Sequence, residues 1–310
     1  MQLRFTKMHG LGNDYVYAEG WSQPLTALDL AAVSRFVSDR HRGIGGDGLI
    51  VALPPETDDA HCRMRMFNAD GSEGQMCGNG IRCVCKLIVD DRLIDPLPQP
   101  LKVATGAGVL SLAYETDADG RMTQVAVDMG APIFEPARVP IDPTAHGVVA
   151  ATTIGPASRL TLDVAGAEAP LDATCVSFGN PHAVIFLPSL AEVTAARLAA
   201  LGSAIEHHSA FPERVNVHFV AVRGSERVSV LHWERGSGAT LACGTGATAV
   251  CVAAALAGKT GPNITAELPG GELALSWDRS GSGHVTMTGP ATRVFDGTLD
   301  VSAFAAAVEA

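Results

Sequence analysis

The chain lacks an uncharged apolar run of about 18 residues, the length that a membrane-spanning helix requires. Its longest candidate, residues 247–258, is too short. The first seven residues contain neither the apolar core nor the cleavage signal of an export leader. We therefore expect a cytoplasmic protein without a membrane span.

An excess of positive charge is also missing. Lys and Arg number 22 against 33 Asp and Glu, which gives a formal net charge of −11. Nonspecific binding to nucleic acid or to an anionic membrane is disfavoured by this balance. A small anionic substrate is still compatible with it, because a local cluster of donors outweighs the global field.

The cysteines do not form the even set of a disulfide framework. There are seven, unevenly spread, in a chain without an export signal. This pattern is typical of reduced thiols in the cytoplasm.

Size and patterning predict two globular domains. A chain of 310 residues with 47% hydrophobic and 18% charged residues buries substantial cores, and two domains of about 150 residues fit the usual size. Hydrophobic spacing predicts helices near 79–91, 190–201 and 245–257 among many short strands. We expect an α/β protein of the α+β type with mostly antiparallel sheets, and a domain crossover near 130–143.

A nonapeptide occurs twice. Cys77 opens CGNGIRCVC and Cys243 opens CGTGATAVC, with five of nine positions identical and an offset of 166 residues. The pair Gly12-Asn13 recurs 167 residues later as Gly179-Asn180. Two repeated motifs with nearly the same offset predict a duplicated domain. Each copy would supply one Cys-Gly-x-Gly turn.

Each duplicated cysteine immediately precedes a predicted helix. Free backbone N–H groups and the positive end of the helix dipole lower the pKa of a cysteine there and bind a carboxylate. Two such thiols on opposite faces of one carbon, one ionised and one protonated, would remove and return a proton. The sequence thus predicts racemisation at an α-carbon, with Cys77 and Cys243 as acid and base.

Other readings of the cysteines and glycines are weaker. Cys83, Cys85 and Cys251 fall on inner helical turns and are interpreted as packing residues, as are Cys62 and Cys175. A metal site from Cys77, Cys83 and Cys85 does not match the spacing of a zinc knuckle. A dinucleotide site at residues 43–48 is disfavoured because a strand follows where a helix should.

Eight segments in order along the chain carry a family resemblance: 7–15, 43–48, 67–72, 76–80, 179–182, 214–216, 234–236 and 242–246. Together they resemble the diaminopimelate epimerases, enzymes of lysine and peptidoglycan precursor synthesis. The resemblance implies two pseudo-symmetric domains, each a barrel-like sheet around a central helix. One domain would comprise residues 1–130 plus about 291–310, and the other residues 131–290.

The resemblance also implies roles for individual residues. Cys77 and Cys243 are its acid/base pair, and His182 and Glu234 tune them. The implied substrate-binding residues are Asn13, Asn68, Gly78, Asn79, Asn180, Asn216, Glu234, Arg235, Gly244 and Thr245. The implied reaction converts LL-diaminopimelate to the meso form with no metal, pyridoxal phosphate or other cofactor. The expected partner is this small molecule, and a homodimer is left open.

Two alternatives stay open at this point. Another two-cysteine racemase, acting on proline, hydroxyproline or histidine, shares the facing thiols. However, proline-type members usually carry His where Asn79 stands. A thiol redox or metal-binding protein is the more remote alternative.

Overall fold

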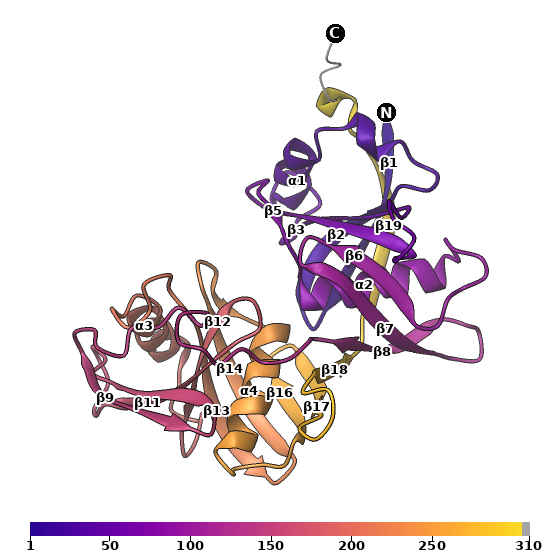
Figure 1. The fold of residues 1–310 in the computed structure, drawn as a ribbon. Helices are drawn as coiled ribbons and strands as arrows, with labels where there is room; N and C mark the ends of the chain where they lie inside the picture. Colours follow the sequence, from indigo (N-terminus) through magenta and orange to yellow (C-terminus); the bar gives the residue numbers. More distant parts are fainter. Residues whose placement is uncertain (306–310) are drawn as a thin grey trace. The chain divides into compact units, whose positions relative to one another are not determined.

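The computed structural model describes residues 1–305, which form two compact units (Figure 1). Unit 1 contains residues 1–127 and the described residues from 289 onward, and unit 2 contains residues 128–288. The return of the chain to unit 1 places the last strand, β19 (Thr292–Asp300), antiparallel to the first, β1 (Gln2–Gly10).

Unit 1 has two α-helices, each between strands of a mixed sheet. Its further elements are β2 (Asn13–Glu19), α1 (Leu30–Ser38), β3 (Gly48–Leu53), β4 (Cys62–Asn68), β5 (Glu73–Gly74), α2 (Gly78–Asp90), β6 (Leu101–Thr105), β7 (Gly108–Thr116) and β8 (Met122–Asp128), with short 3-10 turns at Leu25–Ala27 and Ser302–Phe304.

Unit 2 also combines two α-helices with a mixed set of strands. Its elements are β9 (Val148–Ile154), β10 (Ala157–Leu162), β11 (Leu171–Ser177), β12 (Pro181–Phe186), α3 (Ala195–Glu206), β13 (Asn216–Gly224), β14 (Arg227–Glu234), β15 (Gly238–Thr240), α4 (Gly244–Leu256), β16 (Asn263–Leu268), β17 (Gly271–Trp277) and β18 (Val285–Gly289).

Seven strand pairings of unit 1 have a counterpart of the same direction in unit 2. In unit 1, β1–β2, β3–β4, β4–β5, β6–β7 and β7–β8 are antiparallel, while β2–β3 and β4–β6 are parallel. In unit 2, β11–β12, β13–β14, β14–β15, β16–β17 and β17–β18 are antiparallel, while β12–β13 and β14–β16 are parallel. Parallel neighbours need a crossover, and each of the four helices supplies one. The predicted mixed, mostly antiparallel class is confirmed.

Helices α2 and α4 are the central helices of their units. α2 contacts β1, β2 and β3, and α4 contacts β11, β12, β13, β16 and β17. Nearly every residue of both helices is buried, as expected for helices that are enclosed on all sides.

Helices α1 and α3 cover the opposite faces of the same strands. In β3, Leu49 and Val51 belong to the core under α1, whereas Ile50 lies close to Gly80 of α2. In β13, Val217 and Phe219 belong to the core under α3. A strand with both faces buried requires the near-continuous apolar run that β3 shows.

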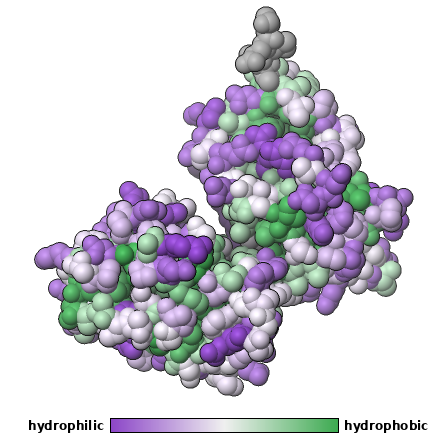
Figure 2. Space-filling view, in the orientation of Figure 1, coloured by the Kyte–Doolittle hydropathy of each residue, from purple (hydrophilic) through white to green (hydrophobic). Residues whose placement is uncertain are grey.

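One helix begins later than predicted. The sequence pattern predicts a helix from about 190, but α3 begins at Ala195, because the Thr194 side chain accepts a hydrogen bond from the Arg197 N–H at 3.2 Å and caps it there. No helix within residues 1–305 is long and apolar enough to cross a membrane. Hydrophilic residues cover much of the face seen in Figure 2.

Candidate active site

Cys77 is the N-cap of α2 and is half-buried. Its sulfur accepts a hydrogen bond from the Gly80 N–H at 3.3 Å, and its thiol donates to Asn13 Oδ1 at 3.4 Å. The thiol therefore sits at the donor-rich start of a helix and also faces a side-chain acceptor.

The orientation of the Asn13 amide is fixed by an ionic cluster. Asn13 Nδ2 donates to Asp47 Oδ2 at 2.8 Å, and the same carboxylate accepts from Arg40 at 3.1 Å. Asp14, the next residue, pairs with Arg40 and Lys7. Because the amide nitrogen must face the Asp47 carboxylate, the amide oxygen must face Cys77.

A buried arginine supports this helix start. Arg82, in the second turn of α2, is fully buried and donates to Asn79 Oδ1 at 3.0 Å, Gly78 O at 3.1 Å and Pro290 O at 3.1 Å. Burial lowers the pKa of its guanidinium. Arg82 is not among the residues predicted from the sequence. Arginine is common on exposed helix faces, and only its position within the apolar nonapeptide hinted at burial.

Cys243 is the N-cap of α4 and is only 4% exposed. Its sulfur lies 3.6 Å from Thr245 Oγ1. Burial raises the pKa of the Cys243 thiol well above its usual value, the charge of Glu234 and a hydrogen bond to it add to the rise, and hydrogen bonds from Thr245 and the Gly246 N–H oppose it. The predicted lowering of a cysteine pKa at a helix start is therefore wrong for Cys243, because burial and a neighbouring carboxylate outweigh the helix terminus.

The second asparagine of the repeat lies beside this cysteine. Asn180 Nδ2 donates to Thr245 Oγ1 at 3.3 Å, and Asn180 Oδ1 lies 2.9 Å from His182 Nε2. His182 is fully buried, and its Nδ1 lies 2.8 Å from His218 Nε2. The structure thus brings the predicted residues Asn180, His182, Thr245 and Cys243 together. It also adds two histidines, His218 and His232, that the sequence analysis did not single out.

Other predicted residues bond the backbone around this cluster. Asn216 Nδ2 donates to Pro181 O at 2.9 Å, and Asn216 Oδ1 accepts from the Arg235 N–H at 3.0 Å. The Arg235 side chain donates to Glu213 O. In unit 1, Asn68 Nδ2 donates to Ser72 Oγ at 3.0 Å within a turn. The substrate-binding roles of these residues stay predictions.

The remaining cysteines are free. Cys62, Cys83, Cys85, Cys175 and Cys251 are buried, and burial raises the pKa of each. Within residues 1–305, no group of three or more His, Cys, Asp or Glu side chains is arranged to hold a metal ion.

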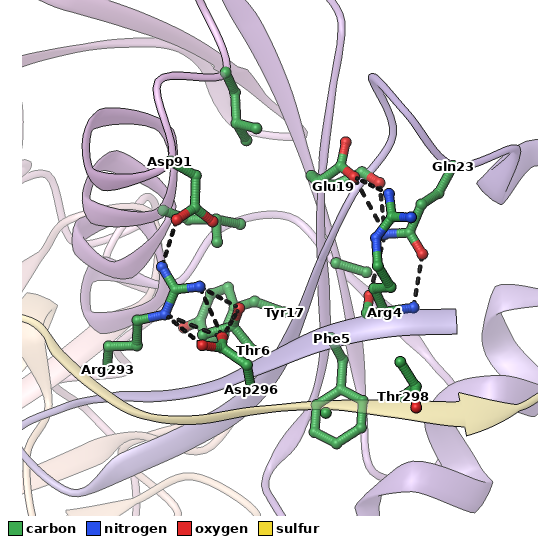
Figure 3. A pocket seen from close by; sticks show the side chains of 14 residues that line it. Arg4, Phe5, Thr6, Tyr17, Glu19, Gln23, Asp91, Arg293, Asp296 and Thr298 are labelled. Carbon is green, nitrogen blue, oxygen red and sulfur yellow. Dashed lines mark hydrogen bonds and ion pairs between the residues drawn. The ribbon is translucent and has the colours of Figure 1, made fainter. Parts of the chain in front are cut away.

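A cavity of about 450 Å³ lies elsewhere in unit 1, against β1, β2, β19 and the end of α2 (Figure 3). Arg293 pairs there with Asp91 and Asp296, and Arg4 pairs with Glu19. None of the predicted site residues lines this cavity. Since its cations are already paired with carboxylates, the charges give no indication of an anionic ligand.

Comparison with known proteins identifies close relatives. The family model described as diaminopimelate epimerase matches residues 5–135 and 174–294. The diaminopimelate epimerase of Methanococcus maripaludis (strain C6) is 42% identical over 299 residues, covering 96% of this chain and 100% of the relative. That of Desulfovibrio desulfuricans is 44% identical over 296 residues, covering 95% of this chain and 97% of the relative.

Solved structures share the fold at low sequence identity. A hydroxyproline epimerase from Agrobacterium vitis superposes with a TM-score of 0.68 at 15% identity, covering 97% of this chain and 93% of that one. A phenazine biosynthesis protein of the PhzF family from Bacillus anthracis gives 0.66 at 14% identity, covering 97% and 100%.

Proposed function

This chain belongs to the diaminopimelate epimerase family, and we propose that it interconverts LL- and meso-diaminopimelate through Cys77 and Cys243 without a cofactor. The observation that carries the proposal is the equivalence of the two thiols. Each is the N-cap of the central helix of its unit. Asn13 bonds Cys77 directly. Asn180 bonds Thr245 Oγ1, which lies 3.6 Å from the Cys243 sulfur.

The reaction needs one ionised and one protonated sulfur. The thiolate takes the α-proton, so the C–H bond breaks and an S–H bond forms. The other thiol gives its proton to the opposite face of the carbanion, which regenerates a C–H bond of inverted configuration. Afterwards the two sulfurs have exchanged their protonation states, and the reverse reaction starts from that state.

Backbone donors of the two helix starts hold the reacting carboxylate. The N–H groups in the first turn of an α-helix have no carbonyl acceptor within that helix, and residues 78–79 and 244–245 occupy the first turns of α2 and α4. In the proposed mechanism they stabilise the enolate-like charge that develops when the proton leaves. The small residues Gly78 and Gly244 allow a close approach of the ligand to the backbone.

Each sulfur has neighbours that favour the thiol and neighbours that favour the thiolate. The oxygen of the Asn13 amide favours a protonated Cys77, because a thiol donates to it and a thiolate cannot. Glu234 favours a protonated Cys243 through its charge, while Thr245 and the Gly246 N–H favour the thiolate. We assign to Glu234 the uptake of the Cys243 proton when that sulfur acts as the base.

The unreacted end of the substrate carries a carboxylate and an ammonium group. A guanidinium forks onto a carboxylate, and a carboxylate or amide oxygen accepts from an ammonium. Arg235, Asn68 and Asn216 are therefore proposed to recognise this end.

Isotope exchange tests the proposal directly. The protein is incubated in deuterated water with LL-diaminopimelate, and separately with L-proline and L-histidine. We expect solvent deuterium to enter only diaminopimelate, with formation of the meso isomer. Exchange confined to a monocarboxylic amino acid would instead identify another two-cysteine racemase.

Single replacements test the roles of the two thiols. Cys77→Ala and Cys243→Ala should each abolish epimerisation, since each removes either the acid or the base. Cys251→Ala, which removes a buried thiol from the same central helix as Cys243, is the matched control and should retain activity. Full activity in either of the first two variants would refute the assignment.

A further inference from the structure

Three buried histidine rings form a row beneath the first turn of α4. They come from three adjacent strands, β12, β13 and β14, and each is at most 1% exposed. His182 Nδ1 lies 2.8 Å from His218 Nε2, and His218 Nδ1 lies 2.7 Å from His232 Nδ1. At its other end the row continues from His182 to the Asn180 amide.

We propose that His218 and His232 are positioning residues for Cys243: the row of histidines fixes the direction of a hydrogen-bond chain so that the Thr245 hydroxyl donates to the sulfur. The inference rests on the proposed role of Cys243 as acid and base. Neither histidine touches the sulfur. Their effect passes through His182, Asn180 and Thr245.

The tautomers of the row follow from its two ends. Asn180 Nδ2 donates to Thr245, so Asn180 Oδ1 faces His182 and must accept from its Nε2–H. A neutral His182 then has an acceptor at Nδ1, which requires an Nε2–H on His218. By the same rule His218 accepts at Nδ1, which requires an Nδ1–H on His232.

Every donor in this arrangement points toward Cys243. Thr245 Oγ1 already accepts from Asn180, so its own proton is available for the sulfur 3.6 Å away. Hydrogen bonds that run in one direction polarise and strengthen one another. The chain thereby favours the thiolate of Cys243 and opposes the effects of burial and of Glu234.

The far end of the row supports the same direction. His232 Nε2 is buried and has no hydrogen-bond partner among the described residues. With the donors directed toward the sulfur, this atom is an unpaired acceptor. The opposite direction would leave a buried N–H unpaired there, and buried N–H groups without a partner are rarer than buried acceptors.

Burial keeps the three rings neutral, as the chain requires. It lowers the pKa of His182 and of His232 to about 3 and that of His218 well below its usual value. Neighbouring histidines lower the pKa values of His182 and His218 further, and Arg235 adds to the effect on His182. At the sulfur end, the charged group that faces Cys243 is Glu234.

The other half of the protein shows that the fold does not need these histidines. In β13 and β14, His218 is the register partner of His232, and in β3 and β4 the corresponding partners are Ile50 and Met66. The central helix meets the two strands in the same way. A Cβ on Gly246 would lie 2.3 Å from the His218 ring, and one on Gly80 would lie 2.5 Å from Ile50. Since apolar side chains fill these places in unit 1, the polar row of unit 2 serves its cysteine.

Alkylation of Cys243 by iodoacetamide measures the effect without any substrate. The full-length Cys77→Ser protein is treated over a range of pH, and modification of Cys243 is followed by peptide mass spectrometry. His232→Met copies the residue of unit 1 and removes the donor at the end of the row far from the sulfur. The hydrogen bonds of the row can then reverse, and the Thr245 hydroxyl no longer has a fixed direction. We expect the pH midpoint of alkylation to rise by about one pH unit, which makes alkylation about tenfold slower below the midpoint.

Matched variants separate the effect of hydrogen-bond direction on the Cys243 midpoint from the effect of lost core packing. His232→Asn keeps an N–H donor near the place of Nδ1 and should retain the original midpoint. Thr245→Val removes the last donor of the chain, should raise the midpoint as His232→Met does, and should add nothing when the two are combined. Leu160→Ala, which empties a buried place elsewhere in unit 2, should lower stability without moving the midpoint.

The proposal is overturned if His232→Met retains the original midpoint, or if His232→Asn or Leu160→Ala shifts it equally. Nitrogen-15 spectra of the histidine-labelled wild-type protein give a test that needs no variant. They should show Nε2–H tautomers at two buried rings and an Nδ1–H tautomer at the third, and the reverse pattern would contradict the inference. Deuterium exchange into diaminopimelate is measured separately, so failure of the chain and failure of the epimerase assignment are distinguishable.

Discussion

Arg82 offers the sharpest test of how the helix that carries Cys77 is held. Its guanidinium is fully buried and bonds Asn79 Oδ1, Pro290 O and Gly78 O. Arg82→Met keeps most of the length and the apolar stem but removes every donor. Gly78 O retains its partner within the helix, whereas Asn79 Oδ1 and Pro290 O lose a buried donor.

The cost follows from those two acceptors. A buried polar group left without its partner costs about 1–3 kcal/mol, so the free energy of unfolding should fall by about 2–6 kcal/mol. The variant no longer buries a charged guanidinium, which offsets part of this cost. The expected loss in free energy of unfolding therefore lies in the lower half of that range. Since Asn79 belongs to the proposed carboxylate site, epimerase activity should fall as well.

Urea unfolding followed by circular dichroism measures this loss. Arg35→Met is the matched control, because Arg35 is an exposed arginine on α1 of the same unit. It should change the free energy of unfolding by no more than about 0.5 kcal/mol. An Arg82→Met protein as stable and as active as the wild type would refute the view that Arg82 organises the start of α2.

Three further predictions concern unit 2. Glu234→Gln removes a charge that raises the Cys243 pKa, so the pH midpoint of Cys243 alkylation should fall, and an unchanged midpoint would exclude Glu234 as its neighbour. The pKa of His182 and of His232 lies near 3 in the folded protein and near 6.5 in the unfolded chain. Each histidine therefore contributes stability that is present above pH 6.5 and is lost as the pH falls toward 3. The free energy of unfolding should fall by about 1.4 kcal/mol per pH unit for each ring. His232→Met should reduce that slope in urea titrations, and an unaltered slope would contradict a buried neutral ring. Gly246→Ala would place a Cβ 2.3 Å from the His218 ring and should destabilise the protein by about 1–3 kcal/mol, whereas Gly224→Ala, which meets no atom within 4 Å, should do far less as judged by thermal unfolding.

The duplicated nonapeptide was enough to locate both helix starts. Helices α2 and α4 begin at Gly78 and Gly244, directly after Cys77 and Cys243 and one residue before the predicted starts near 79 and 245. The mixed, mostly antiparallel class was also predictable, because short runs with turn residues between them are local signals. The resemblance to diaminopimelate epimerases, which rested on eight short segments, is confirmed by relatives that match nearly the whole chain.

Burial and charge at the site were not predictable in the same way. A helix start argues for a low cysteine pKa, yet burial and Glu234 raise that of Cys243. Arg82 has the sequence signature of an ordinary helix residue but is fully buried. His218 and His232 occupy alternate positions of strands, where a single histidine carries no recognisable signal.

The sequence by itself determined the repeated cysteine turns, the helices that follow them and the plan of two similar units, since repeats, helix caps and hydrophobic periodicity are properties of neighbouring residues. Only the tertiary structure decided which polar groups share a buried environment. Strand pairing brings His182, His218 and His232 into one row although 50 residues separate the first from the last. Hydrogen bonds and pKa values depend on such distances in space, and the order of residues along the chain does not specify them.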